Sequence, residues 1–364
     1  MPRKLAALFS FCVIDTLGFG ILIPLVPYMA DRFGTAPQLI TPVLGSYSLC
    51  QLLAAPWWGR LSDRYGRRPV LMTSLAGAMA GNIAAAFAYA ADVSPPEKRA
   101  ASLGLVGAAI GIGFTLGQPL GGLLAGGDPH TANFSLPAAV SVGTSLLAIL
   151  LVRFVLPESH TAEHRRQHPD ESRRGAWRLL STREALALLA AATLIVTYSQ
   201  SILESIFAIW ALHRYGYGPR VVGFLLFAVA LPALLMQGGL VRLLAPRLGE
   251  GRLASFGVIS YVAGLLLLGY ASTLAVTVGG LLFCGIGLGA YNPSASALAS
   301  KQARGHDRGA VMGAYVASAS LARVLGPFSS GALYAGLGPA APFLIGACVT
   351  LPAAWLVRRA AALG

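Results

Sequence analysis

The stretch GRLSDRYGRRPVLMTSLAGAMAGN, Gly59–Asn82, decides how this chain is interpreted. Its first part combines an aspartate, a turn glycine and several arginines, which is the pattern of a short charged loop between membrane helices. Its second part, from Leu75 onward, has the small, apolar composition of a helix inside the bilayer. A membrane crossing needs roughly 20 residues, and almost no sequence separates the two parts.

The rest of the chain has the composition of an all-α polytopic membrane protein. Of its 364 residues, 55% are hydrophobic and only 11% are charged, whereas a soluble chain carries about 25% charged residues. The first apolar stretch is too long for a cleavable signal peptide. The apolar residues predict segments at about 5–30, 39–58, 69–92, 100–126, 134–156, 182–212, 220–241, 253–271, 273–298, 309–335 and 338–357.

The net charge of +13 is distributed by loop. If the N-terminus is cytoplasmic, 23 of the 27 lysines and arginines fall on the cytoplasmic side. Only Arg32, Arg214 and Arg220 fall on the opposite side, and Arg323 lies within a segment. This asymmetry follows the positive-inside rule. It predicts a cytoplasmic N-terminus and gives no reason to expect a nucleic-acid partner.

The chain divides into two halves of unequal length. The polar stretch 157–181 predicts a cytoplasmic linker between a first bundle, residues 1–156, and a second bundle, residues 182–364. A weak internal repeat relates the halves. Leu61, Arg64 and Gly66 match residues 183 positions later, whereas Gly117 and Gly122 match residues 209 positions later.

The jump between these two offsets predicts that the first half lacks about one membrane span. Eleven crossings would also place the termini on opposite sides of the membrane, which conflicts with the charge distribution. Either segment 69–92 is re-entrant, or an ancestral pair of crossings is fused into one. The sequence leaves both possibilities open.

Three motifs carry a resemblance to a known family. The loop motif comprises Gly59, Asp63, Arg64, Gly66, Arg67 and Arg68; the first-helix motif comprises Asp15, Gly18, Gly20, Pro24 and Pro27; the glycine motif comprises Gly107, Gly111, Gly113, Gly117, Gly121 and Gly122. Together they resemble the major facilitator superfamily, and within it the drug:proton antiporters of the tetracycline-exporter type. The resemblance covers essentially the whole chain and implies a two-bundle fold, here with about 11 segments instead of 12.

The sequence departs from the family pattern at one position that bears on mechanism. The family's fourth helix begins with an arginine implicated in proton coupling, and Thr73 and Ser74 stand here instead. The resemblance implies that Asp63 and the motif arginines form a latch with Asp92. Because the third helix is missing, the sequence leaves open whether Asp92 reaches the motif.

Asp15 is the first candidate for proton coupling. It lies in the middle of the first segment, where a carboxylate costs roughly 2.5–3.5 kcal/mol and is expected to face a wet interior. Such a group can exchange a proton with its surroundings. The alternative is a neutral acid that is hydrogen-bonded for packing.

A second group of candidates lies in the other half. Glu204 follows Gln200 by one helical turn, and Phe207 and Trp210 continue along the helix. A carboxylate with neighbouring aromatic rings suits an amphiphilic cation, although a core stripe gives the same spacing. Arg323 is an intramembrane cation that we assign to coupling, and Asp15 and Glu204 are its candidate partners.

Gly113, Gly117 and Gly121 recur on one helical face beside Gly122 and predict close helix packing. GIGFTLG does not predict a dinucleotide site, because no strand precedes it. We find no nucleophile triad, Walker loop or metal cluster, and expect no enzyme activity, cofactor or metal.

The resulting hypothesis is a monomeric transporter of a bacterial inner membrane that exports a small amphiphilic compound in exchange for protons. Two alternatives remain: a membrane-inserted but transport-inactive deletion remnant, and a carrier for metabolite uptake.

Overall fold

Long apolar helices make up most of the computed structural model, which describes residues 3–75, 82–94, 99–158, 180–303 and 308–363. Within these residues, nine helices are long and apolar enough to cross a membrane, and no strand is present. The nine helices coincide with nine of the predicted segments. The prediction of an all-α polytopic membrane protein is therefore confirmed.

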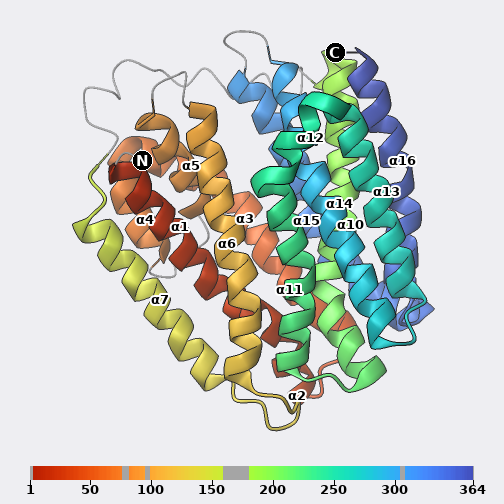
Figure 1. Ribbon diagram of the computed structural model, residues 1–364. Coiled ribbons are helices and arrows are strands. Elements are labelled where there is room, and N and C mark those ends of the chain that lie inside the picture. The colour runs from red at the N-terminus through yellow and green to blue at the C-terminus, as the bar shows by residue number, and fades with distance from the viewer. Residues whose placement is uncertain (1–2, 76–81, 95–98, 159–179, 304–307, 364) are drawn as a thin grey trace. The chain divides into compact units, whose positions relative to one another are not determined.

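The described elements are all helices (Figure 1). They are α1 (Arg3–Leu22), η1 (Ile23–Leu25), α2 (Val26–Arg32), α3 (Pro37–Tyr65), α4 (Arg67–Leu75), α5 (Asn82–Asp92), α6 (Arg99–Ala125), α7 (Ser135–Phe154), α10 (Glu184–Tyr215), α11 (Pro219–Leu235), the π-helix η3 (Met236–Leu240), α12 (Val241–Leu248), α13 (Glu250–Gly269), α14 (Leu274–Lys301), α15 (Arg308–Leu337) and α16 (Ala341–Leu363).

The helices group into two compact units. Unit 1 comprises Met1–Met29, Leu49–Pro169 and Tyr217–Phe227, and unit 2 comprises Ala30–Ser48, Asp170–Gly216 and Ala228–Gly364. Most of unit 1 comes from the first half of the sequence and most of unit 2 from the second. Helices α3 and α11 each contribute one part to either unit.

The two units repeat one packing pattern. In unit 1, α1 packs against α6 and α7, and in unit 2, α10 packs against α15 and α16 in the same chain order. Gly117 of α6 approaches the backbone of α1, and Gly326 of α15 approaches the backbone of α10. These two glycines are 209 residues apart, so the packing agrees with the repeat found in the sequence.

The units differ where the sequence offset jumps. In unit 2, the 20-residue α13 and the 28-residue α14 pack along one another. In unit 1, the described residues at the corresponding place form the 9-residue α4 and the 11-residue α5, which pack against each other. At 1.5 Å per residue these two helices reach about 14 and 17 Å, roughly half of a bilayer core each.

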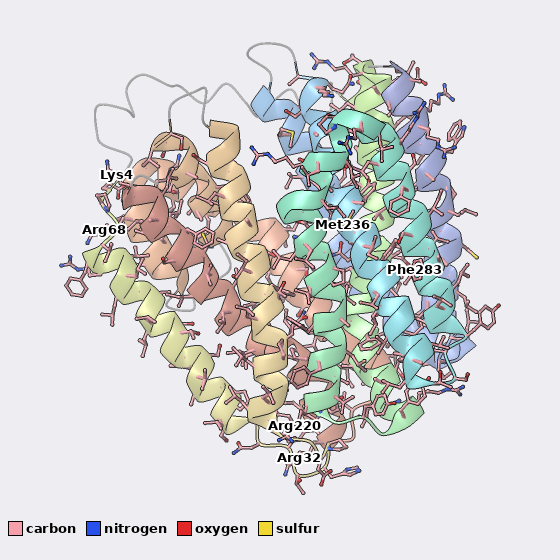
Figure 2. All side chains as sticks on the ribbon, in the orientation of Figure 1. Lys4, Arg32, Arg68, Arg220, Met236 and Phe283 are labelled. Carbon is pink, nitrogen blue, oxygen red and sulfur yellow. The ribbon has the colours of Figure 1, made fainter. Side chains whose placement is uncertain are left out.

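Three labelled basic residues of unit 1 lie at its two ends, divided as the charge distribution predicts. Figure 2 shows Lys4 and Arg68 at one end of the unit and Arg220 at the other. Lys4 and Arg68 belong to the group predicted to be cytoplasmic, and Arg220 belongs to the opposite group. The positions of these three charges within unit 1 therefore agree with the predicted grouping.

Candidate functional site

A seam of glycines joins α1 and α6 in unit 1. A Cβ atom added at Gly117 would lie 2.6 Å from the carbonyl oxygen of Leu17 and 2.9 Å from the Cα of Gly20. A Cβ at Gly113 would overlap Thr16 and the carbonyl of Val13. Because real Cβ atoms do not approach backbone atoms this closely, only glycine permits this helix spacing.

The other two predicted packing glycines also make close contacts. A Cβ at Gly121 would overlap the carbonyl of Ile21 on α1, and one at Gly122 would lie 2.5 Å from the carbonyl oxygen of Pro219 on α11. These four glycines therefore pack α6 against α1 on one face and against the start of α11 on the next.

Asp15 lies half-buried within this packed region of α1. The adjacent hydroxyl of Thr16 donates to the carbonyl of Cys12 at 2.6 Å. On the α7 side, the hydroxyl of Ser141 donates to the carbonyl of Gly18 at 2.9 Å. The hydrogen bond from α7 and the glycine contacts from α6 thus hold the segment that carries the carboxylate.

The loop motif forms a hydrogen-bonded cluster within unit 1. Arg67 donates from Nε to Oδ2 of Asp92 at 3.0 Å and from its guanidinium to the hydroxyl of Ser62 at 3.0 Å. The side chains of Arg67 and Asp92 are 10% and 17% exposed. This buried ion pair joins the first residue of α4 to the last residue of α5.

The contact resolves the uncertainty about Asp92 that the sequence left open. The carboxylate reaches the motif, and it does so through Arg67. Because the two ends of segment 67–92 meet, the chain leaves this segment on the face of unit 1 where it entered. Of the two possibilities for this segment, the geometry agrees with the re-entrant one.

Glu158 completes this cluster, and sequence reasoning missed it. Its two carboxylate oxygens accept the backbone N–H groups of Arg67 at 2.8 Å and Arg68 at 3.1 Å. These are the first N–H groups of α4, which have no partner within the helix, and a carboxylate is favoured at this end. Gly66 precedes them with φ +105°, and a Cβ there would lie 2.6 Å from Glu158.

The remaining loop-motif residues have different positions. Arg68 donates to the carbonyls of Val152 and Arg153 at the end of α7. Arg64 is exposed, and its guanidinium lies 5.5 Å from the ring centroid of Tyr65. Gly59 and Asp63 belong to α3, and the Asp63 side chain lies outside the described part, so its role in the latch stays a prediction.

The candidate residues of unit 2 lie on α10 and α15. Gln200 donates to Oε1 of Glu204 at 2.8 Å, and Glu204 is exposed between buried neighbours. Arg323 is exposed on α15, the helix that packs against α10. Among the candidate partners considered for Arg323, Glu204 is the acid that unit 2 places in its vicinity.

Phe207 and Trp210 are buried in the core of unit 2. They are 0% and 2% exposed. Their ring centroids lie 5.7 Å apart, and the Trp210 ring meets that of Phe343 on α16 edge to face at 5.3 Å. This geometry matches the core-stripe alternative, because neither ring has surface available for a substrate.

A repeated bundle of long apolar helices with ionisable residues inside them defines a polytopic membrane transporter. The sequence comparison makes this specific. The chain belongs to the Major Facilitator Superfamily, whose family model matches residues 8–87, 75–273 and 189–362.

Curated relatives of similar length are tetracycline and multidrug resistance proteins. The chain is 30% identical to the class G tetracycline resistance protein of Vibrio anguillarum, with 95% of each chain covered. It is 29% identical to the class C tetracycline resistance protein of Escherichia coli, over 99% of this chain and 97% of the relative. It is also 25% identical to multidrug resistance protein 2 of Bacillus subtilis (strain 168), over 90% and 88%.

Solved structures share the fold. The human organic anion transporter MFSD10 superposes with a TM-score of 0.73 at 23% identity, covering 98% of this chain and all of the transporter. The nucleoside transporter NupG superposes with a TM-score of 0.73 at 14% identity, covering 99% of both chains. These identities are low, so the two structures establish the fold alone.

Proposed function

We propose that this protein exports a small amphiphilic, drug-like compound across a bacterial inner membrane in exchange for protons. The family membership and the tetracycline and multidrug resistance proteins among the relatives support this proposal. The observation that carries it is the intact α1–α6 seam, which holds Asp15 in mid-helix and half-buried.

In this proposal Asp15 is the group that binds and releases the proton. A carboxylate at this depth is stable only beside water or a polar partner. Protonation removes its charge and lowers the free-energy cost of enclosing it in the bundle. The seam transmits this change because α1 and α6 are in backbone contact and move together.

The hypothesis of an inactive remnant predicts that the missing residues disrupt the first bundle. The Arg67–Asp92 pair, the Glu158 contacts and the glycine seam are all formed. These contacts support a folded first bundle with its latch in place, and we therefore favour transport.

The test is export by the wild-type chain and by a matched pair of variants. The protein is expressed in a drug-sensitive bacterium, and accumulation of a panel of fluorescent amphiphilic drugs is measured with and without a proton gradient. We expect the wild type to lower accumulation only when the gradient is present. Asp15→Asn abolishes this effect, because an amide cannot carry a proton.

Asp128→Asn is the matched control, since it makes the same chemical change in the exposed loop between α6 and α7. It should retain wild-type export. Gradient-dependent export that survives in Asp15→Asn would contradict the assignment of Asp15. Absence of export for every compound in the panel would count against the proposed function.

A further inference from the structure

Two opposite charges lie near each other on neighbouring helices of unit 2. Glu204 is on α10. Arg323 lies near the middle of α15. The helices run parallel, because Ser201 contacts Arg323, Ser205 contacts Ser330 and His213 contacts Tyr334. Both side chains belong to one packed pair of helices.

Close packing fixes the spacing between the two helices. The hydroxyl of Ser201 donates to the carbonyl of Arg323 at 3.3 Å. A Cβ added at Gly326 would lie 2.6 Å from the Cβ of Ser201 and 3.0 Å from the carbonyl of Tyr198. Glu204 lies one turn above Ser201, and Arg323 lies one turn below Gly326. The charges are therefore offset along the helix axis by roughly one to two turns of 5.4 Å each.

Despite their proximity, the two side chains do not form an ion pair. Within the described residues, no contact of 4.0 Å or less joins the guanidinium to the carboxylate, and the guanidinium has no other hydrogen-bond partner. Glu204 receives one hydrogen bond, from Gln200 to Oε1. Both side chains are exposed, whereas Leu203 and Ser205 beside Glu204 are buried.

A charge at this depth is unfavourable in hydrocarbon. Two such charges, held apart by rigid packing and both accessible, form an open dipole. A ligand with a single charge would satisfy one of them and be repelled by the other. A ligand with both charges would satisfy the two at once.

We propose that Glu204 and Arg323 bind a zwitterionic amphiphile, with its cationic group at Glu204 and its anionic group at Arg323. This inference rests on the proposed function, because it names the class of compound that the transporter carries. Gln200 positions the carboxylate through its hydrogen bond to Oε1 and leaves Oε2 for the ligand. The apolar part of the ligand contacts the exposed apolar surface of the same two helices.

The experiment compares three probes that share one aromatic scaffold and differ in which charged groups they carry. They are tryptophan, a zwitterion; tryptophan methyl ester, a cation; and N-acetyltryptophan, an anion. Kd values are measured by titration of the purified full-length protein in lipid nanodiscs. We expect the zwitterion to bind at least about tenfold more tightly than either derivative, since each is deprived of one charge-assisted contact.

Substitution of each charge should remove one part of this preference. In Glu204→Gln, tryptophan and N-acetyltryptophan should bind within about threefold of each other. In Arg323→Gln, the same should hold for tryptophan and its methyl ester. Glu250→Gln is the matched control in the same unit. Its carboxylate pairs with Lys301 at 2.7 Å, where α13 begins and α14 ends. Loss of this carboxylate should leave the tenfold preference unchanged.

The wild-type comparison requires no variant to fold and is decisive alone. Equal binding of all three probes, or tighter binding of the cation, would overturn the proposal, as would absence of zwitterion binding. Gradient-dependent drug export together with no zwitterion preference would reject this inference and leave the proposed function in place. Absence of export together with a clear zwitterion preference would reject the proposed function and leave the binding site for a zwitterion in place.

Discussion

Gly117 lies where α1 and α6 approach so closely that one added methyl group has no space. The atoms that it would meet, the Leu17 carbonyl oxygen and the Gly20 Cα, are backbone atoms that cannot rotate away. Gly107 is on the same helix, and a Cβ there would meet nothing within 4 Å. Both positions are glycines of α6 and differ in the space around them, so the same substitution at each gives a matched pair.

Gly117→Ala should lower the free energy of unfolding by about 1–3 kcal/mol, because α1 and α6 must move apart to accept the methyl group. Gly107→Ala should leave it unchanged or raise it by up to about 1 kcal/mol, since alanine favours the helix. Thermal unfolding of the purified variants in one detergent measures both effects. Equal behaviour of the two variants would show that the seam is not tightly packed.

Residue spacing predicted the glycines well and the aromatic residues poorly. A four-residue glycine repeat has few interpretations in a membrane helix other than close packing. Phe207 and Trp210 fit both a ligand-binding stripe and a core stripe, since periodicity alone does not show which face is covered. The position of Phe343, more than 130 residues later in the chain, decides between them.

At the scale of elements, α4 and α5 form a short pair whose ends are fastened together. Arg67 and Asp92 close the pair, and Glu158 binds the first N–H groups of α4. Tyr89 of α5 adds a hydrogen bond to the carbonyl of Pro157 at 2.9 Å. The contacts around the end of α7 therefore hold both short helices.

The Arg67–Asp92 pair should contribute measurably to stability. In a double-mutant cycle of Arg67→Met and Asp92→Asn, we expect a coupling energy of about 0.5–3 kcal/mol, because the pair is mostly buried. The exposed pair Arg359–Glu184, with side chains 50% and 55% exposed, is the control. Its coupling should stay below about 1 kcal/mol. A smaller coupling for the buried pair than for the exposed one would argue against the latch.

The sequence predicted the shortened segment but not how it is fastened. The jump in repeat offset predicts that residues are missing between the loop motif and Gly77. Nothing in the sequence linked Glu158 to Arg67, because 91 residues separate them and a single acid after a helix has many possible partners. The proline–glutamate pair directly after an apolar segment was the available signal, and it is a weak one.

At the scale of the whole molecule, the short pair decides the topology of the chain. If segment 67–92 returns to the face where it entered, every later helix keeps the direction that the charge distribution requires. If it crosses, the basic linker 157–181 lies on the opposite side from the loop motif. The deletion is compatible with transport only in the first case.

Side-specific cysteine labelling distinguishes these cases and is the most direct test of the account. Single cysteines are introduced at Glu97, in the charged sequence PPEKR before α6, and at His130, in the exposed loop after α6. The four native cysteines are first replaced. Ser94 is a poor alternative because it is only 5% exposed.

An impermeant thiol reagent is then added to intact cells and to inverted membrane vesicles. We predict labelling of Glu97→Cys only in inverted vesicles and of His130→Cys only in intact cells, as a re-entrant segment requires. The reverse pattern would mean that segment 67–92 crosses the membrane. In that case the later helices are inverted, and the proposal of a proton-coupled exporter would be wrong for this chain.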